Sequence, residues 1–288
     1  MSLSIVIPVR NESKVCELFI NVLMATIKTN CEILIVYDDK NDTTIDVIKL
    51  LQKKHNNIKS VLNDGLSGAV NAFKKGIEVA QYDTILLSSI DEIFPIIVID
   101  EMYYLIKNEN CDLVSGTRYS LGGKRYGGFF WGKNLSILAN FIFKKITNFP
   151  LSDSTTGLKM FKKKIIMDME IESNPIGWAF AFEISIKFYL TGAKFGEVPL
   201  IAVDRAFGGD SKFSGNTVSW SKEYFRWFKW GIKEIGNYKK KLKKLVYINL
   251  IKQYLKKLKF ISFIYFIANP QNIFFCHFKT RRKPKKFI

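Results

Sequence analysis

ILIVYDD, at residues 33–39, decides how the chain folds, because it joins a short apolar run directly to two aspartates. TILLSSIDE, at residues 84–92, repeats this arrangement and places Asp91 and Glu92 after its apolar run. Short runs of Ile, Leu and Val bounded by polar residues are typical of buried parallel strands. Ligands bind beyond the carboxyl ends of the strands in an open α/β sheet. We therefore expect carboxylates from two strands to meet in one crevice, which suits a divalent cation and an anionic ligand such as a nucleotide diphosphate.

Strands and helices alternate outward from these two stretches. The pattern predicts strands at residues 3–8, 32–36, 59–62, 84–87 and from 113–115, and helices at residues 15–26, 44–55, 69–80 and 96–108. Such alternation indicates an α/β fold with a mainly parallel sheet flanked by helices. After Arg118 the pattern weakens, and the glycine pairs at 122–123 and 127–128 predict a loop.

The net charge of +18 is concentrated near the C-terminal end of the sequence. Residues 216–288 hold 19 of the 44 Lys and Arg residues but only 2 of the 26 Asp and Glu residues. The preceding residues are therefore nearly neutral as a group. We predict a folded domain at residues 1–215 and a basic tail at residues 216–288.

The tail contains two segments in which apolar residues recur at helical spacing opposite lysines and arginines. The apolar stripes are Trp220, Tyr224, Trp227, Phe228, Gly231 and Ile235, and then Tyr247, Leu250, Ile251, Tyr254, Leu258 and Ile261. Basic amphipathic helices of this kind lie in membrane interfaces. The basic run at residues 279–286 adds attraction to anionic lipid of about 1 kcal/mol per basic residue. We therefore expect peripheral association with an anionic membrane surface, on the inner, cytoplasmic face of the cell membrane.

Other features narrow the class of protein. Residues 260–278 lack charged residues, but the amides around Pro270 favour an interfacial or packed segment over a membrane span. The four cysteines are scattered, which favours reduced thiols in the cytosol, and the two histidines form no zinc motif. The apolar run at residues 3–9 is too short for a signal peptide.

A series of short motifs follows the alternating pattern in a fixed order. They are SIVIPVRNE (4–12), YDD (37–39), GLSGAV (65–70), SID (89–91), GTRY (116–119), DSTTGLK (153–159), WAFAFE (178–183), GEVP (196–199), DR (204–205) and GDSK (209–212). This series resembles family 2 glycosyltransferases of the GT-A fold, and most of all their dolichyl-phosphate mannosyltransferase-like branch. The resemblance covers roughly residues 3–215, and the order of the motifs is more specific than any one of them.

The resemblance implies a Rossmann-like nucleotide-diphospho-sugar transferase. Its implied reaction moves a sugar from a GDP- or UDP-sugar to a dolichyl or undecaprenyl phosphate, with inversion. The residues implied to bind the nucleotide sugar are Pro8, Arg10, Glu12, Tyr37, Asp38, Asp39, Gly65, Ser89, Ile90 and Asp91. Those implied to contact the acceptor or its phosphate are Arg118, Arg125, Lys133, Ser136, Arg205, Ser211 and Lys212. The implied catalytic residues are Asp91, Asp153 and Glu183, with Asp91 as a ligand of Mg²⁺ or Mn²⁺.

Two positions depart from the pattern of that branch. Ser89 stands where the first carboxylate of the D-x-D metal motif is usual, and Ile93 stands where a Gln is usual. A hydroxyl is a much poorer ligand for a hard cation than a carboxylate. Metal binding would then rest on Asp91, the phosphates of the donor and water. Weak metal dependence and an inactive homologue both remain open.

Several of these residues also fit a structural role. Asp91 and Glu12 are suited to cap helices, and the pair at 38–39 is suited to shape a turn with residues 40–42. Arg125 and Lys133 also fit ordinary solvated charges. Asp153 would only orient a cationic side chain if the acceptor is a phosphate, which is already nucleophilic at neutral pH and needs no strong base. Glu183 would equally serve as the partner of a buried base.

Two other functions fit parts of the sequence. One is a family 2 transferase that adds a sugar to a hydroxyl of a cell-surface glycan or glycolipid, for which a catalytic base is required. The other is a nucleic-acid-binding protein with a basic arm, which the apolar stripes of the tail disfavour. The sugar, the base of the nucleotide and the oligomeric state are left open by the sequence.

Overall fold

The computed structural model describes residues 2–127, 130–174, 178–203 and 217–268. The chain forms two compact units, Met1–Gly236 and Asn237–Ile288. The predicted boundary between residues 215 and 216 lies before this division. Part of the last helix therefore belongs to the first unit, and the two units are described separately below.

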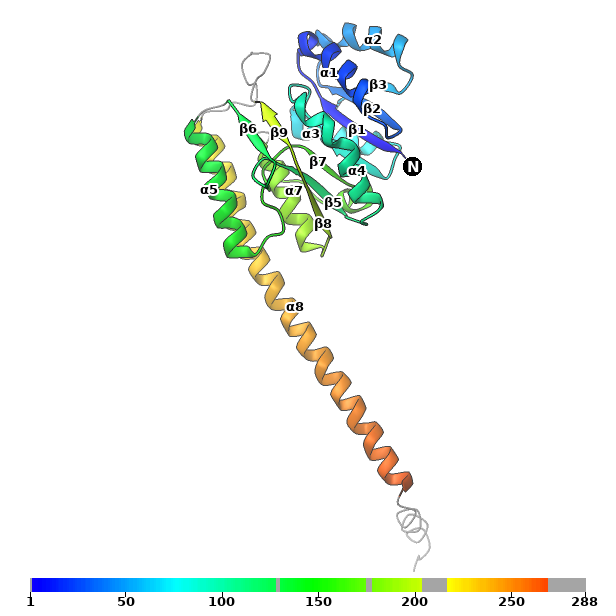
Figure 1. Ribbon diagram of the computed structural model, residues 1–288, viewed down its shortest axis with the longest axis vertical. Helices are drawn as coiled ribbons and strands as arrows, with labels where there is room; N and C mark the ends of the chain where they lie inside the picture. The colour runs from blue at the N-terminus through cyan, green and yellow to red at the C-terminus, as the bar shows by residue number, and fades with distance from the viewer. Residues whose placement is uncertain (1, 128–129, 175–177, 204–216, 269–288) are drawn as a thin grey trace, which may run out of the picture. The chain divides into compact units, whose positions relative to one another are not determined.

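The first unit is built on a seven-stranded sheet with the strand order β3-β2-β1-β4-β7-β5-β8 (Figure 1). The strands are β1 (Leu3–Pro8), β2 (Cys31–Tyr37), β3 (Ile58–Leu62), β4 (Thr84–Leu87), β5 (Leu113–Thr117), β7 (Lys159–Lys162) and β8 (Phe195–Pro199). All neighbouring strands pair in parallel except β7, which is antiparallel to β4 and β5. The predicted strands and the mainly parallel sheet are confirmed.

Strand β1 lies between β2 and β4, so the two acidic stretches end at the same edge of the sheet. In register, Val6 pairs with Leu34 of β2 and with Leu87 of β4. Neighbouring strands are spaced about 4.8 Å apart, which puts the ends of β2 and β4 about 10 Å from one another. Because β7 runs the opposite way, its first residue, Lys159, also lies at this carboxyl edge.

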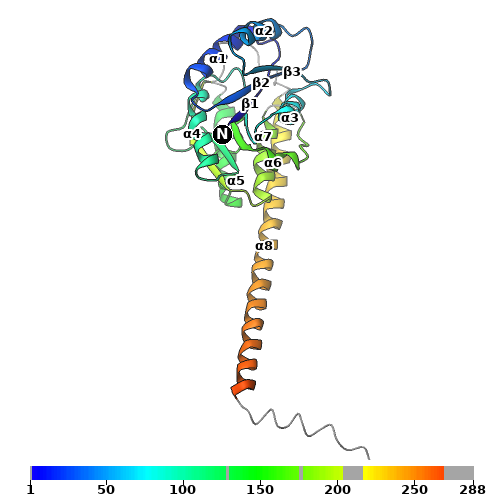
Figure 2. The same ribbon diagram turned by 90° about the vertical axis from the view of Figure 1, so that its right-hand side faces the viewer.

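Helices cover both faces of the sheet (Figure 2). They are α1 (Ser13–Thr26), α2 (Thr44–Lys54), α3 (Ala69–Val79), α4 (Ile99–Lys107), α5 (Phe130–Thr147), α6 (Lys163–Met167), α7 (Ala179–Leu190) and α8 (Thr217–Ala268). The buried residues of α1, α2 and α4 form one core with one face of the sheet. Those of α3, α6 and α7 form a second core with the opposite face, and α5 and α8 add side chains to it.

Two predicted segments differ from the structure. The helix expected at residues 96–108 begins as a 3-10 helix, Phe94–Val98, and becomes α4 at Ile99. The loop expected after Arg118 contains one short strand, β6 (Lys124–Tyr126), which pairs with β9 (Ile201–Val203) from the segment after β8, and the chain then enters α5. Helix α5 was missed because it turns polar Ser136 and Asn140 inward, which breaks the usual apolar periodicity.

The first turns of α8 pack into the first unit. Trp227 and Ile235 are 3% and 1% exposed. A Cβ at Gly231 would lie 2.8–2.9 Å from side-chain atoms of Ile186 and Phe143, so only glycine allows this close approach. The two amphipathic segments predicted for the tail are parts of this one helix.

The second unit is described by the remainder of α8, which exposes both lysines and large apolar residues. The exposed apolar residues here are Leu242, Leu245, Val246, Tyr247, Ile248, Leu250 and Ile251. Among the helices in the described part of the chain, none is both long enough and apolar enough to cross a membrane. Of the segment 260–278, residues 269–278 lie outside the described residues.

Candidate active site

The first loop of the site joins β1 to α1 at the carboxyl edge. Asn11 takes a positive φ of 56°, a conformation that Asn tolerates better than most residues. Its backbone N–H donates to both carboxylate oxygens of Asp42, at 3.1 and 2.9 Å. Asp42 also accepts hydrogen bonds from the backbone N–H and hydroxyl of Thr44. Asp42 therefore fixes the loop after β1 to the start of α2, a role that the sequence analysis did not assign.

Asp38 joins the loop after β2 to the loop after β3. One of its oxygens accepts from Asn63 Nδ2 at 2.7 Å, and the other accepts from the backbone N–H of Gly68 at 2.8 Å. Gly68 has a φ of 118°, which an L side chain would disfavour. Asn63 is a second residue that the sequence analysis missed, and its own backbone N–H donates to the carbonyl of Tyr37 at 2.8 Å.

Asp39 is exposed at the end of the same strand, next to Asp38. Its Oδ1 accepts from the backbone N–H of Asn41 at 2.8 Å, which is the local turn expected of an aspartate in this position. The turn-forming role of Asp39 is therefore present, and its exposed carboxylate still faces the carboxyl edge where the loops converge.

The loop after β4 carries the candidate metal ligand. Asp91 is exposed, and the Ser89 hydroxyl donates a hydrogen bond to its Oδ1. Helix capping does not explain Asp91, because the following 3-10 helix begins at Phe94 with Ile93 in the cap position and no capping side chain. Ile90 is only 2% exposed and packs in the core. Its side chain therefore faces the core, and only its backbone groups remain to contact a nucleotide.

The described residues contain no group of three or more His, Cys, Asp or Glu residues that would hold a metal ion. Asp91 with the Ser89 hydroxyl is thus an incomplete ligand set by itself. Mg²⁺ commonly binds through one or two carboxylates and completes its octahedron with substrate phosphates and water. The arrangement therefore fits a cation that arrives with a nucleotide diphosphate, and it does not fit a permanently bound metal.

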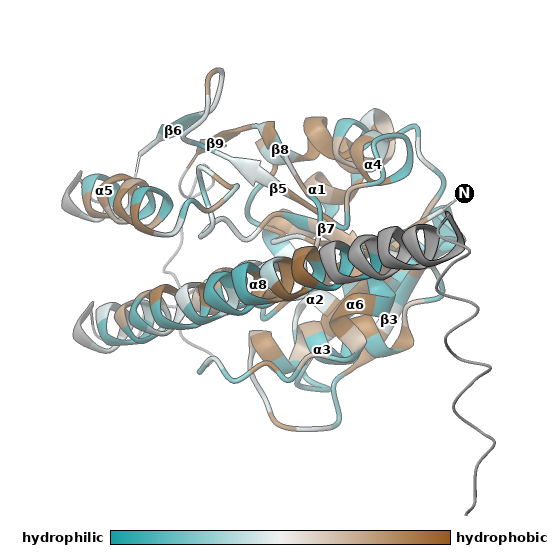
Figure 3. Ribbon diagram, turned by 90° about the horizontal axis from the view of Figure 1, so that it is seen from below, coloured by the Kyte–Doolittle hydropathy of each residue, from teal (hydrophilic) through white to brown (hydrophobic). Residues whose placement is uncertain are grey.

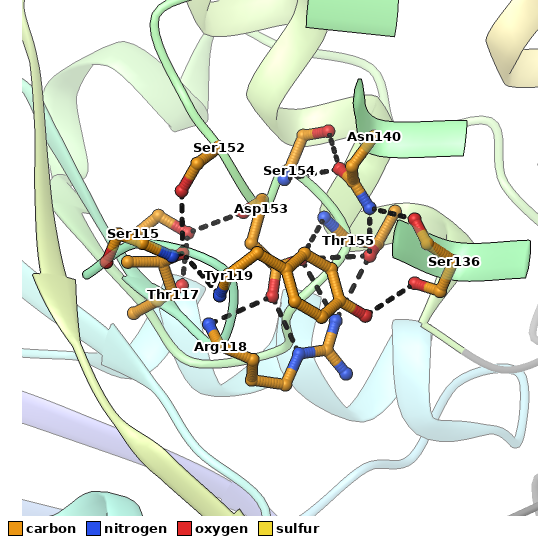
Figure 4. A network of polar contacts seen from close by, with 12 residues as sticks. Ser115, Thr117, Arg118, Tyr119, Ser136, Asn140, Ser152, Asp153, Ser154 and Thr155 are labelled. Carbon is orange, nitrogen blue, oxygen red and sulfur yellow. Dashed lines mark hydrogen bonds and ion pairs between the residues drawn. The ribbon is translucent and has the colours of Figure 1, made fainter. Parts of the chain in front are cut away.

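A buried ion pair lies at the end of β5 (Figure 4). The Arg118 guanidinium donates from Nε to Asp153 Oδ2 at 2.6 Å and from Nη2 to Oδ1 at 2.9 Å. The Asp153 side chain is 0% exposed and that of Arg118 is 14% exposed. Burial by itself would raise the pKa of Asp153, but the attached guanidinium outweighs burial and holds the pKa of this carboxyl below its usual range. Asp153 is therefore a permanent anion at neutral pH.

Polar residues of α5 and the loop before β7 complete this network. Asp153 also accepts from the Thr155 hydroxyl at 3.0 Å, and Asn140 Oδ1 accepts from the backbone N–H of Ser154 at 2.9 Å. Ser136 accepts a hydrogen bond from the Tyr119 hydroxyl at 2.8 Å. The predicted acceptor residue Ser136 is thus brought close to Arg118 by the ring of Tyr119, whose centroid lies 5.0 Å from the Arg118 guanidinium carbon.

One terminal nitrogen of the Arg118 guanidinium, Nη1, does not donate to Asp153. Within the described residues, its Nη1 has no hydrogen-bond partner, whereas Nε and Nη2 both donate to Asp153. Burial by itself would lower the pKa of Arg118, but the Asp153 carboxylate outweighs burial and raises this pKa, with a smaller contribution from Glu92 in the loop after β4. A guanidinium held on one side by a carboxylate is oriented to receive phosphate oxygens on the other.

Two charged residues that the sequence analysis left without a role lie beneath this pair. Lys159 is 0% exposed and donates from Nζ to the Ser115 hydroxyl at 3.0 Å. Glu197 Oε1 accepts from the backbone N–H groups of Ser152 and Asp153, at 2.6 and 3.2 Å. Both residues stand in the motifs quoted above, but their types and spacing do not reveal that the fold buries Lys159 fully and Glu197 in part.

Glu183 is the second carboxylate predicted to act as an acid or base, and its contacts are structural. It is 0% exposed and accepts from the backbone N–H groups of Glu172 and Ser173, at 2.7 and 2.8 Å. Its Oε1 also forms an ion pair with Lys187 at 2.7 Å. With both oxygens engaged and no exposed surface, Glu183 cannot contact a substrate in this conformation, which corrects the catalytic expectation.

The remaining predicted residues lie at the same edge or outside the described chain. Pro8 ends β1, Tyr37 ends β2, and Gly65 lies in the loop after β3. Glu12 precedes α1 without a capping side-chain hydrogen bond, and Arg10 is exposed beside it.

Arg125 lies in β6, and its carbonyl accepts from Lys133 Nζ of α5 at 3.0 Å. This contact joins the short β6–β9 sheet to α5. The predicted acceptor residues Arg205, Ser211 and Lys212 lie outside the described residues.

A mainly parallel sheet with flanking helices, whose acidic loops converge at one carboxyl edge, defines a GT-A fold of the kind that binds nucleotide sugars. A comparison of the amino-acid sequence with protein families supports the same class of protein. The model of the family described as Glycosyl transferase family 2 matches residues 4–169. The chain belongs to this family.

Individual relatives are distant. Glycosyltransferase GlyG of Streptococcus pneumoniae serotype 4 (strain ATCC BAA-334 / TIGR4) is 24% identical over 118 residues, which cover 41% of this chain and 39% of that protein. The chain thus matches well under half the length of that relative.

Solved structures share the fold at low identity. Glucosyl-3-phosphoglycerate synthase from Mycobacterium tuberculosis, in complex with Mn²⁺, uridine diphosphate and phosphoglyceric acid, has a TM-score of 0.59 at 13% identity, over 80% of this chain and 78% of that chain. S. aureus TarS 1-349 has a TM-score of 0.52 at 16% identity, over 70% of this chain and 60% of that chain. At these identities the likeness establishes the fold alone.

Proposed function

We propose that this family 2 glycosyltransferase transfers a sugar, with inversion, from a nucleotide-diphosphate sugar to the phosphate of a polyprenyl phosphate. The donor occupies the carboxyl edge at β1, β2 and β4, and the acceptor phosphate contacts Arg118. This assignment corresponds to the dolichyl-phosphate mannosyltransferase-like branch of the family. The runner-up is transfer to a hydroxyl of a cell-surface glycan or glycolipid.

Two features support a nucleotide-sugar donor. The loops around Asp38, Asp39 and Asp91 lie at one edge of the sheet. Carboxylates there are suited to accept hydrogen bonds from ribose hydroxyls, and a cation held there is suited to bind the phosphates. Solved structures with the same fold contain UDP, UDP-glucose and Mn²⁺ or Mg²⁺. A UDP-sugar is therefore the first donor to test, and a GDP-sugar the second.

Asp91 would hold the divalent cation. Bound there with the nucleotide, the cation neutralises the charge that develops on the leaving diphosphate. Ser89 orients the Asp91 carboxylate through its hydrogen bond and adds no second negative charge. We therefore expect activity that depends on metal less steeply than it would with two carboxylates.

The observation that carries the choice of acceptor is the state of the two candidate bases. Asp153 is buried and bound to Arg118, and Glu183 is buried and bound to backbone N–H groups and Lys187. A hydroxyl acceptor needs a base within hydrogen-bond reach of its proton, and neither carboxylate offers one. A phosphate acceptor is already an anion, so the unpartnered Nη1 of Arg118 meets its main requirement.

A membrane surface is the expected location of such an acceptor, on the cytoplasmic face. Helix α5 supports this part of the proposal, because its outer side is apolar while its inner side carries Ser136 and Asn140. Brown, hydrophobic segments alternate with teal ones along α5 (Figure 3). Its exposed apolar residues are Leu135, Ile137, Leu138, Phe141, Ile142 and Ile146. Lys144 and Lys145 adjoin them and are suited to anionic headgroups.

The test supplies labelled UDP- and GDP-sugars together with undecaprenyl phosphate in anionic vesicles. We expect a lipid-linked sugar, and we expect Arg118→Gln to reduce its formation by about 100-fold or more. The matched control is Lys49→Gln, which removes a cation from an exposed ion pair on α2. Transfer to glycan hydroxyls with no lipid-phosphate product from any donor would contradict the proposal and favour the runner-up.

A further inference from the structure

Three polar side chains form a row across neighbouring strands beneath the Arg118–Asp153 pair. Ser115 of β5 pairs in register with Lys159 of β7 on one side and with Glu197 of β8 on the other. Residues paired in register on adjacent strands carry their side chains on the same face of the sheet. The row lies at the carboxyl edge, directly under the loop that contains Asp153, whose carbonyl lies 3.4 Å from the Ser115 hydroxyl.

Lys159 is the unusual member of this row. It is 0% exposed, and within the described residues the Ser115 hydroxyl is its one hydrogen-bond partner. An ammonium has three N–H donors, so its charged form is poorly satisfied by protein groups alone. Burial lowers the pKa of Lys159 to about 7, against the attraction of Asp153 and Glu197 and with the repulsion of Arg118. The charge of this side chain therefore changes in the neutral range.

The four charged groups of this cluster balance one another only while Lys159 is protonated. Arg118 and Lys159 then supply two positive charges, and Asp153 and Glu197 supply two negative ones. Loss of the Lys159 proton leaves the four groups together, the guanidinium included, with one net negative charge. Because Lys159 and Asp153 are fully buried, this charge is weakly screened by water and salt.

We propose that Lys159 is a positioning residue whose protonation sets the affinity of the Arg118 side for a phosphate group. In its charged form it offsets one of the two carboxylates beneath Arg118, so that the cluster carries no net negative charge to oppose the ligand. In its neutral form the excess negative charge repels the same ligand. The proposal rests on the proposed function, in which Arg118 contacts the acceptor phosphate.

Proton linkage predicts how the affinity for phosphate changes with pH. Phosphate binding favours the charged form of Lys159, so binding at a pH above 7 takes up a proton. The affinity for the phosphate therefore falls as the pH rises from 6 to 8.5. We expect the fall to be about tenfold for the loss of one buried charge within this cluster. The phosphate itself titrates near pH 6 and gains charge over the same range, which would strengthen binding to a cation. The two effects have opposite signs and can be separated.

The test measures the affinity of the full-length protein for farnesyl phosphate by calorimetry at pH 6, 7 and 8.5, with farnesol as the uncharged probe. For the wild-type protein we expect affinity to fall about tenfold across this range, with proton uptake seen as a dependence on buffer ionisation enthalpy. Lys159→Arg keeps its charge and should abolish both the fall and the proton uptake. Lys159→Met should bind weakly at every pH. The matched control, Lys162→Met at the other end of β7, should behave as the wild type.

Three results would overturn the proposal: identical pH profiles for the wild type and Lys159→Arg, no proton uptake by the wild type, or full affinity of Lys159→Met at pH 8.5. UDP affinity of each variant reports whether the sheet edge is intact. If Lys159→Met fails to fold, Ser115→Ala replaces it and should move the fall in affinity to lower pH, because it removes the partner of the ammonium. Unchanged binding by Arg118→Gln would instead contradict the proposed function, so the two failures are distinguishable.

Discussion

At the scale of single residues, the site depends on a carboxylate that the protein has taken out of contact with solvent. Asp153 accepts hydrogen bonds from the Arg118 side chain and backbone and from Thr155, and it is fully buried. Such a group is stable only as a paired anion, because an unpaired buried charge carries a large desolvation penalty. In the proposed function, it holds Arg118 in place for the acceptor phosphate.

This pairing predicts a stability effect with a defined pH dependence. Arg118→Met removes one partner and should lower the free energy of unfolding by about 3–5 kcal/mol at pH 7, measured by urea denaturation. The folded pKa of Asp153 is depressed, so its stabilising contribution is present above the ordinary carboxyl pKa and is lost as the pH falls below it. The difference between the two proteins should therefore shrink from pH 7 to pH 3.

The control for this measurement is Lys49→Met, which breaks an ion pair whose side chains are 66% and 88% exposed. An exposed pair contributes about 1 kcal/mol or less. An equal loss of stability in the two variants would contradict the account of Asp153 as a buried, paired anion.

The positions of the site residues were predictable from the sequence, but their burial and pairing were not. The strand ends that carry Asp38 and Asp91 were predictable, because apolar runs followed by carboxylates mark the carboxyl edge of a parallel sheet. The burial of Asp153, Lys159 and Glu183 was not, because a motif gives the residue type but not the partner that saturates it. Their roles as paired or structural charges required the geometry.

At the scale of elements, the predictable helices were those with one apolar face turned to the sheet. Helices α1 and α3 bury Phe19 and Phe73 in this way, at 0% and 1% exposed. Strand β7 was not predicted, because four residues after a loop carry too little periodicity to be assigned. Helix α5 was missed for the opposite reason: its inward side is partly polar and its outward side is apolar, so its pattern contradicts the rule for a surface helix.

The inverted polarity of α5 predicts a contribution to membrane binding. Phe141→Glu places a charge on a side chain that is 58% exposed, so folding should be unaffected. Loss of one aromatic side chain that inserts into the bilayer should reduce partitioning onto anionic vesicles by about tenfold, measured by vesicle co-sedimentation. Leu50→Glu, on α2 and also 58% exposed, is the matched control and should leave partitioning unchanged.

Equal partitioning of Phe141→Glu and the wild type would show that α5 does not contact the bilayer. That result would leave membrane association to the basic tail alone. A loss shared equally by Leu50→Glu would indicate a general effect of added negative charge, and would also contradict a specific role for α5.

In the whole molecule, the acidic loops proposed to bind the nucleotide sugar and the excess of Lys and Arg residues lie in different parts of the chain. The acidic loops lie in the first unit, at the edge formed by β1, β2 and β4, whereas most of the excess positive charge lies beyond residue 215. Composition predicted a sheet domain and a basic tail that divide after residue 215, whereas the compact units divide after residue 236. The aromatic residues that attach the first turns of α8 to the sheet domain, such as Trp227, also fit a membrane-facing stripe.

The central claim is that side chains from the ends of β2 and β4 together bind a nucleotide diphosphate. It is tested most directly by the thermal stability of the protein with UDP, with and without Mn²⁺. Ligand at 100 times its dissociation constant stabilises the folded state by about 2.7 kcal/mol, which corresponds to about 5–10 °C in a domain of this size. We expect this increase for the wild type and for Asp83→Asn, which changes an exposed carboxylate that precedes β4 at the opposite edge of the sheet. Asp39→Asn and Asp91→Asn should each reduce the increase, and Asp91→Asn should also remove the part that depends on Mn²⁺. An equal increase in all four proteins, or none with any nucleotide diphosphate, would contradict the account.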